Sequence, residues 1–383
     1  MKTGTSINGL VTTLTEQQKM AADYIAPSQR LSYAMREEIP EGMSAIDAIL
    51  EQVEVDDDGQ PIVTDSRISP HLVVDNVGVF KPGNIFHQQM ATILKIPSKY
   101  YQRALERQPE LLVDEVNIWL HEKLGDKPAV GDRMVRSLGP TARALLSNKY
   151  RRLDNLPLLM SCIDTLDRLG VEPEHIVSCE VTERRMYLKV ITPKLEGEIG
   201  VGDIVQAGLV LSNSEVGQGS VSVQPLIFRL TCLNGAIMQD GALKQKHLGR
   251  LQNEGQVFKD DTVKKSDEAF YSQVRDVIDH TLSEEVFNLQ LDKIREANGA
   301  PVSVEVPKAV ERLSGAYDLN EGESDAVLDN FIRGGAFTRW GLANAVTLTS
   351  QADGTQYDRA TDLERIGGKI VEMSAAQWDA IAN

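Results

Sequence analysis

The segment from Asp203 to Met238 constrains the fold most, because it is the one region dense enough in apolar and β-branched residues to begin a sheet. Two apolar runs, at 204–211 and 221–233, are separated by a polar loop that contains two glycines. Glycine adopts positive φ at little cost, so this arrangement predicts a β-hairpin with a long loop.

The second apolar run changes phase at Pro225. Val221 and Val223 occupy odd positions, whereas the apolar residues from Leu226 to Cys232 occupy even ones. A slip of one residue exchanges the two faces of a strand, and proline cannot donate a hydrogen bond to its neighbour. We therefore predict a β-bulge or a strand bend at Pro225.

Two strand patterns and a helix precede the hairpin. The strands are predicted at about 175–182 and 185–192, and the helix begins after Asp154 and ends at Gly170. A helix that packs on a sheet indicates an α+β fold. We expect a central antiparallel sheet, at about residues 175–235, that is packed by helices.

The last third of the chain is acidic and has a helical pattern. Helices are predicted at about 263–281 and 284–297, and further ones follow up to residue 381. Ser283 and Ser374 are predicted N-caps, the second in a capping box with Gln377. We expect an acidic C-terminal helical layer.

Two of the helices predicted in the first 130 residues have a specific start or a specific buried face. Thr15 fits the N-cap of a short helix that runs to about Tyr24. A second helix, at 109–124, has one apolar stripe, which predicts that its members all face the core: Leu112, Val116, Trp119 and Leu120.

Shifts in composition suggest four regions. They are an N-terminal arm at 1–40, a mixed region at 41–130 with helices between 86 and 125, an α+β core at 131–255 with the hairpin 203–238, and a helical region at 256–383.

Several classes of protein are disfavoured by composition. No run of about 18 apolar residues exists, so no membrane span is expected, and the N-terminus lacks the apolar core of a secretory signal. The three cysteines form no CxxC pair and the six histidines have no metal-ligand spacing. We expect a cytoplasmic protein without a cofactor.

Charge is unevenly distributed. The chain carries −16, but residues 131–250 contain fifteen Lys and Arg against thirteen Asp and Glu. Cations beside aromatic rings are the combination that single-strand grooves use. The candidate nucleic-acid-binding residues are therefore Lys149, Tyr150, Arg151, Arg152, Arg184, Arg185, Tyr187, Lys189, Arg229, Lys244, Lys246 and Arg250.

Motifs of catalysis are absent from the sequence. Neither GxSxG nor a phosphate-binding GxxxxGK[ST] motif occurs, so no catalytic residue is predicted. Four carboxylates in or beside the predicted sheet are weak candidates for a metal pair of a phosphoryl hydrolase: Glu180, Asp203, Glu215 and Asp240.

Six segments, at 94–101, 109–120, 143–155, 212–215, 229–235 and 344–347, occur in the order found in one family. With LKIPSKYY at 94–101, RALLSNKYRRLDN at 143–155 and RLTCLNG at 229–235, the chain resembles the phage/plasmid-like proteins (the DUF932-type family). That family, carried by bacteriophages, prophages and plasmids, has no settled activity. The resemblance implies a mobile element in a host bacterial cytoplasm and work on nucleic acid.

Three functions remain open. The leading hypothesis is a non-enzymatic protein that binds single-stranded nucleic acid in phage replication or recombination. The first alternative is a scaffold or host-factor inhibitor that meets host or phage proteins through the acidic C-terminal third. The second is the metal-dependent hydrolase. A homo-oligomer is expected.

Overall fold

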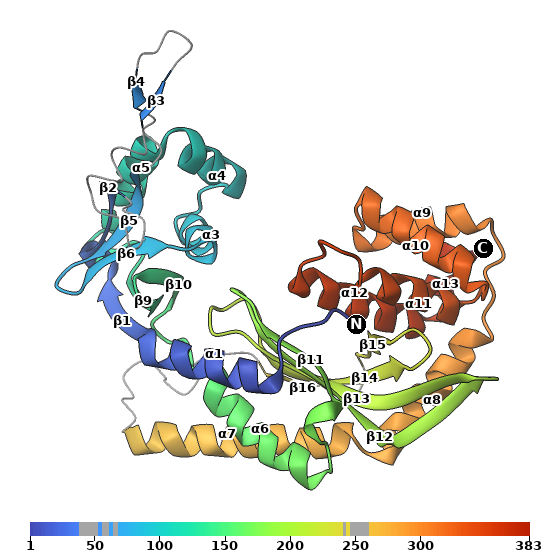
Figure 1. Ribbon diagram of the computed structural model, residues 1–383. Coiled ribbons are helices and arrows are strands. Elements are labelled where there is room, and N and C mark those ends of the chain that lie inside the picture. Colours follow the sequence, from blue (N-terminus) through green and yellow to red (C-terminus); the bar gives the residue numbers. More distant parts are fainter. Residues whose placement is uncertain (38–52, 56–60, 64–67, 240–242, 246–259) are drawn as a thin grey trace. The chain divides into compact units, whose positions relative to one another are not determined.

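The structure is a computed structural model that describes residues 1–37, 53–55, 61–63, 68–239, 243–245 and 260–383 (Figure 1). The chain forms two compact units. Unit 1 consists of Met1–Glu16 and Arg151–Asn383, and unit 2 consists of Gln17–Tyr150. None of the described helices combines the length and the apolar character needed to cross a bilayer.

Unit 1 is built on an antiparallel sheet, which confirms the predicted α+β fold. Its strands lie in sequence order, and a short strand, β16, pairs with β14. The strands are β11 (Ile176–Val181), β12 (Met186–Gly200), β13 (Asp203–Asn213), β14 (Val221–Arg229), β15 (Asn234–Ile237) and β16 (Leu243–Gln245). The predicted hairpin is thus β13 and β14.

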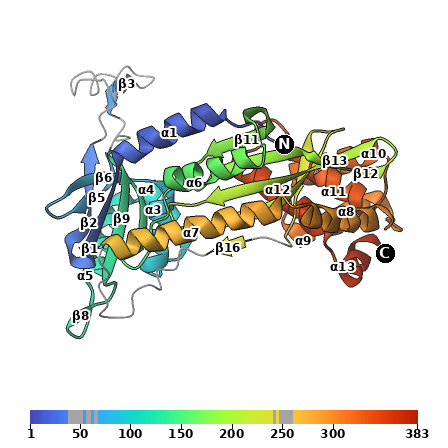
Figure 2. The same ribbon diagram turned by 90° about the horizontal axis from the view of Figure 1, so that it is seen from below.

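Helices cover both faces of this sheet. Figure 2 shows α6 (Asn155–Arg168) and α7 (Asp260–Thr281) side by side across one face. The remaining helices of the C-terminal layer are α8 (Glu284–Asn298), α9 (Val306–Tyr317), α10 (Glu321–Gly334), α11 (Arg339–Thr349), α12 (Tyr357–Val371) and α13 (Ala375–Ala382). The backbone of α12 meets β15 so closely that a Cβ on Gly368 would lie 1.9 Å from the Ile237 carbonyl oxygen.

The predicted bulge at Pro225 is wrong. Within the described strands, the pairing of β13 with β14 runs without a register shift from Ser212 opposite Ser222 to Val205 opposite Arg229, with Leu209 opposite Pro225. The apolar pattern changes phase because both faces of β14 are buried. Val221 and Val223 pack toward α6 and α7, whereas Leu226 and Phe228 fill a separate cluster on the other face.

Unit 2 has a mixed sheet in the order β1-β9-β10-β6-β5-β2, in which β10 and β6 are parallel and the other pairs antiparallel. Its strands are β1 (Ala21–Pro27), β2 (Leu31–Glu37), β5 (Ile68–Val74), β6 (Gly78–Pro82), β9 (Asp132–Leu138) and β10 (Thr141–Ser147). The small pairs are β3 (Val53–Val55) with β4 (Pro61–Val63), and β7 (Lys123–Leu124) with β8 (Lys127–Pro128).

Three helices pack against the sheet of unit 2: α3 (Asn84–Ile93), α4 (Ser98–Arg107) and α5 (Pro109–His121). The side-chain amide of Asn117 on α5 accepts from the backbone N–H of Tyr33 at 2.7 Å and donates to its carbonyl oxygen at 2.9 Å. Asn117 therefore makes the pair of hydrogen bonds that a neighbouring strand would make with the edge strand β2. It satisfies the N–H and the carbonyl oxygen of Tyr33, which would otherwise lack a partner at the sheet edge.

The N-terminal helix differs from its prediction. Helix α1 spans Ile7–Met20, and residues 21–27 form β1 instead of extending the helix to Tyr24. Thr15 is not an N-cap, because it lies inside α1, where its hydroxyl donates to the Val11 carbonyl oxygen at 2.7 Å. Threonine and serine hydroxyls make this bond within helices, so a capping pattern in the sequence does not by itself show where a helix begins.

Candidate nucleic-acid interface

The boundary between the two units falls within the segment Lys149–Arg152, and the side chains of this segment differ in exposure. Lys149 and Arg152 are exposed and Tyr150 is half-buried. Arg151 instead binds the Asp267 carboxylate at 2.7 Å and lies over the Phe270 ring, with its guanidinium carbon 5.2 Å from the ring centre. Arg151 therefore fixes α7 within unit 1.

Two of the predicted binding residues lie inside unit 1. Lys189 is completely buried, and its ammonium donates to the Glu364 carboxylate on α12 at 2.5 Å, with the Glu364 side chain also at 0% exposure. Tyr187 is buried as well and donates to Asp358 at 2.7 Å. A buried side chain cannot contact a phosphate in this fold, so a continuous basic track along β12 does not exist.

The other predicted cations have mixed environments. Arg184 is exposed, whereas Arg185 donates to the Gln218 carbonyl oxygen. Arg229 binds Asp203, which also accepts from the Trp340 indole at 3.1 Å. The side chain of Lys244, together with Lys246 and Arg250, lies outside the described residues.

Of the four carboxylates of the hydrolase hypothesis, the three that the structure describes make separate contacts. Asp203 binds Arg229, Glu180 accepts from the Val181 N–H, and Glu215 accepts from the Asn155 N–H. Asp240 lies outside the described residues. Among the residues that are described, no group of three or more His, Cys, Asp and Glu could hold a metal ion.

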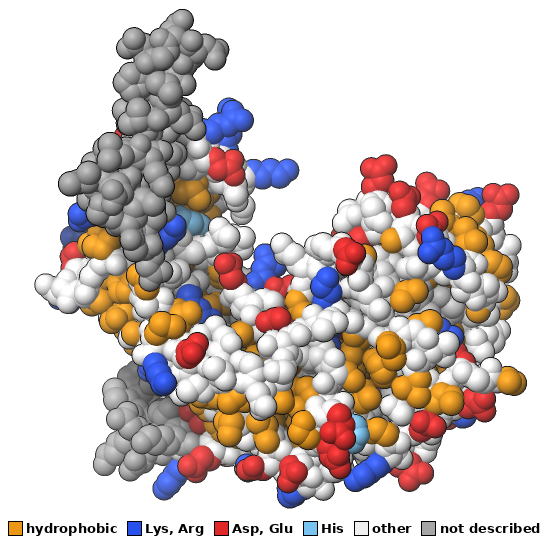
Figure 3. Space-filling model, viewed as in Figure 1, with side chains coloured by type: hydrophobic (Ala, Val, Ile, Leu, Met, Phe, Trp, Pro, Cys, Tyr) orange, Lys and Arg blue, Asp and Glu red, His pale blue; other side chains and the backbone are white. Residues whose placement is uncertain are grey.

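A basic stripe that the sequence did not single out lies on α4 of unit 2. Lys99, Arg103 and Arg107 follow each other at four-residue spacing, which places them on one face of a helix with 3.6 residues per turn. All three are exposed, and none has a salt bridge among the described residues. Figure 3 shows Lys and Arg side chains projecting where α4 lies.

Two exposed aromatic rings lie beside the stripe. Tyr100 of α4 and Trp119 of α5 are 44% and 43% exposed, and both line a groove of about 720 Å³ together with Lys95. Glu115 accepts a hydrogen bond of 3.0 Å from the Tyr100 hydroxyl, which raises the pKa of that phenol. The groove thus combines one cation, Lys95, with two aromatic rings, and the carboxylates of Glu115 and Glu122 also line it.

Comparison with known families decides the membership of the chain. Residues 144–366 match a family described as a domain of unknown function, DUF932, and this match covers more than half of the sequence. The chain belongs to the DUF932 family. No curated protein and no solved structure matches it.

The DUF932 match and the basic stripe fall in different parts of the chain. The match covers most of unit 1 and only the last seven residues of unit 2, from Ala144 to Tyr150. The stripe at 99–107 and the groove therefore lie outside the family match.

The exposed ring of Trp119 corrects one prediction. Leu112, Val116 and Leu120 are buried at 0% exposure, as their stripe on α5 predicts, but Trp119 is not part of the core. Positions 116, 119 and 120 lie on neighbouring parts of one helix face. The elements that pack on α5, which are β2, β5 and α4, decide which part of this face is covered. The basic stripe was readable in the sequence from its four-residue spacing.

Proposed function

We propose that this DUF932 protein binds single-stranded nucleic acid without catalysing a reaction, and that the α4 stripe and the groove of Tyr100 and Trp119 form the binding surface. The observation that carries the proposal is the juxtaposition of three exposed cations, which have no salt bridge to any described residue, with two half-exposed rings in one unit. Single-strand binders combine a positive surface for the backbone with aromatic platforms for bases.

The charges of α4 suit a phosphate backbone. A guanidinium or ammonium group that already has a carboxylate partner must lose it to bind a phosphate. In the part of the chain that the structure describes, Lys99, Arg103 and Arg107 have no such partner. The ten residues of α4 span about 15 Å. The stripe is thus long enough to contact several phosphates.

The proposal extends to biological context. We infer a phage or plasmid origin, action in the bacterial cytoplasm and a homo-oligomeric state, which suit a protein that coats strands during replication or recombination. Lys149, Arg152 and Arg184 are exposed cations that can add phosphate contacts.

Trp119→Ala is expected to weaken binding of a strand of about 12 nucleotides by about tenfold or more, because a base stacked on an aromatic side chain contributes about 1–3 kcal/mol. Fluorescence anisotropy with a labelled oligonucleotide measures the loss. Since the Trp119 ring is partly exposed, the circular dichroism spectrum should stay unchanged.

Ile118→Ala is the matched control. Ile118 is the neighbour of Trp119 on α5, is 68% exposed and does not line the groove. Its replacement should leave strand affinity within a factor of two or so, as for other exposed positions. Equal losses in the two variants would show that stacking on Trp119 plays no part.

A further inference from the structure

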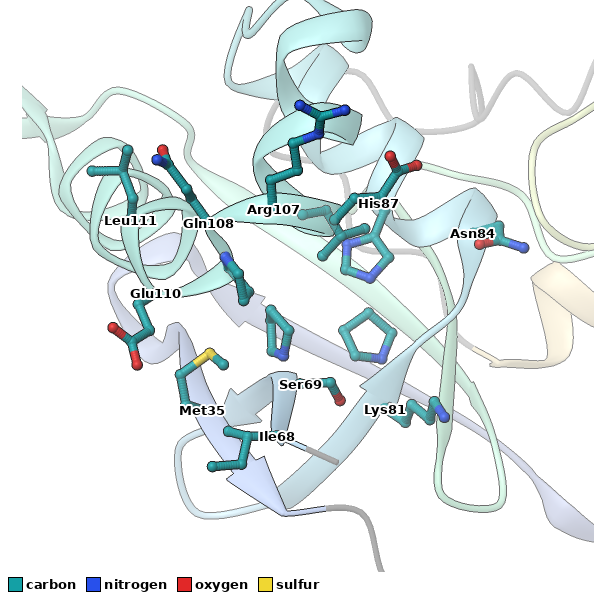
Figure 4. Close-up of a pocket in the computed structure, with 15 residues that line it drawn as sticks. Met35, Ile68, Ser69, Lys81, Asn84, His87, Arg107, Gln108, Glu110 and Leu111 are labelled. Carbon is teal, nitrogen blue, oxygen red and sulfur yellow. The ribbon is translucent and has the colours of Figure 1, made fainter. Parts of the chain in front are cut away.

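A second pocket of unit 2 has a histidine in its lining. Its volume is about 920 Å³, and it lies between β5, β6, the start of α3 and the segment that joins α4 to α5. Figure 4 shows the His87 ring turned into the space bordered by Met35, Ser69 and Lys81, whereas the Arg107 side chain points away from it.

His87 belongs to a triangle of hydrogen-bonding groups. Its Nδ1 lies 3.0 Å from the Tyr101 hydroxyl and 3.2 Å from the Tyr33 hydroxyl, and the two hydroxyls lie 3.2 Å apart. Both tyrosines are buried, which raises the pKa of each phenol. Both phenols therefore keep their protons and each needs an acceptor.

The triangle defines the tautomer of His87. Two O–H groups find acceptors within it only if one phenol donates to the other and the second donates to Nδ1, so Nδ1 carries no proton. Burial lowers the pKa of His87 to about 4, so the ring is neutral at pH 7. The proton of the neutral ring is then on Nε2, which has no partner among the described residues.

The pocket therefore presents an uncharged N–H donor within a lining that mixes apolar and polar side chains. Pro70 and Pro82 are buried, and Leu105 and Pro109 line the pocket with them. The carboxylates of Glu106 and Glu110 belong to the lining too. Amide side chains of Asn84 and Gln108 line it as well. Flat proline rings beside a directed N–H donor suit a flat heterocycle that carries a carbonyl acceptor.

The position of the pocket connects it to the basic stripe. Arg107 belongs both to the stripe and to the pocket lining, and Tyr100, near the other end of α4, belongs to the groove. A strand whose phosphates follow α4 would pass from the groove to the mouth of this pocket.

We propose that the His87 pocket takes one unstacked nucleobase of the bound strand and that the His87 Nε2–H donates to a carbonyl oxygen of this base, as in thymine or uracil. This proposal rests on the proposed function. Recognition of unstacked bases through their polar edges, with flat side chains beside the ring, is the common mode for single strands.

The test compares strands of about 12 nucleotides that carry either thymine or 2,4-difluorotoluene, which has the shape of thymine and no carbonyl. The full-length protein should bind the thymine strand about fivefold more tightly at about 50 mM salt, the ratio that one net hydrogen bond gives. In His87→Phe the ratio should fall to about one, because the donor is gone.

His87→Phe also removes the acceptor of a buried phenol, so a measurement on the unaltered protein accompanies it. The ¹⁵N chemical shift of His87 Nε2 should move when the thymine strand binds and should stay in place with the difluorotoluene strand. A shift with thymidine 5′-monophosphate but none with the strand would assign the pocket to a free nucleotide and overturn the proposal.

The outcomes separate this inference from the proposed function. If the protein binds neither strand, the proposed function fails and the pocket loses its ligand. If the protein binds both strands equally well, or if the fivefold ratio persists in His87→Phe, strand binding stands and only the base pocket is overturned.

Discussion

Lys189→Met should lower the free energy of unfolding of unit 1 by about 3–5 kcal/mol, the usual loss when one member of a buried ion pair is removed. Lys189 and Glu364 are both at 0% side-chain exposure, and the Lys189 ammonium is also 4.8 Å from the centre of the Tyr357 ring. Burial lowers the pKa of Lys189, and the Glu364 charge opposes this change. Without Lys189, Glu364 remains buried without the ammonium group that donates to it.

The second variant of this experiment removes both charges. Lys189→Met with Glu364→Leu should recover most of the lost stability, because an apolar pair of similar volume avoids the cost of burying charge. Lys194→Met is the control, since Lys194 lies on the same strand with an exposed side chain. Its ammonium donates to the Leu169 carbonyl oxygen at 3.1 Å, so its loss should cost no more than about 1 kcal/mol.

Urea unfolding followed by hydrogen exchange in peptides of β12 and α12 measures the effect in unit 1. This readout is needed because a chain with two compact units need not unfold in one step. A loss below about 1 kcal/mol for Lys189→Met would contradict the buried pair, since exposed ion pairs contribute that little.

Replacing Lys99, Arg103 and Arg107 together by Ala should weaken single-strand binding on the order of a hundredfold at about 50 mM salt, if each cation contributes about 1 kcal/mol to a charged hydrogen bond. The slope of log affinity against log salt should become shallower by about 2, because each lost phosphate contact removes about 0.7 for a single strand. The melting temperature should hardly change, since the three side chains are exposed.

A triple variant of unit 1 controls for net charge. Lys265, Lys308 and Arg333 are exposed, and their replacement by Ala changes the charge of the chain by the same amount. Arg333 has only an exposed pair with Asp329 at 3.4 Å, which contributes little to stability. If both triple variants lose affinity equally, the effect comes from net charge and the α4 stripe is not the site.

Local signals in the sequence predicted the C-terminal helices well. The hydroxyl of Ser283 accepts from the Val286 N–H at the start of α8, and Ser374 and Gln377 form the predicted capping box of α13. The hairpin strands β13 and β14 also lie where their apolar runs predict them. These elements depend on side chains a few residues apart, which sequence patterns record.

Features that depend on distant parts of the chain were not predictable in this way. Lys189 alternates with apolar residues on β12, which resembles a solvent-facing position, but it is buried because α12 supplies Glu364 from 175 residues later. The phase change at Pro225 has the same origin, since helices cover both faces of β14. The triangle of Tyr33, His87 and Tyr101 likewise joins residues from β2, α3 and α4.

The most direct test of the account is a titration of the full-length protein with labelled single-stranded and duplex oligonucleotides at about 50 mM and 200 mM salt, because phosphate contacts are revealed by the salt dependence of affinity. We predict binding of the single strand in preference to the duplex, weakening markedly at the higher salt. No binding of either nucleic acid at the lower salt would contradict the account and would favour a protein partner for the acidic C-terminal helices instead.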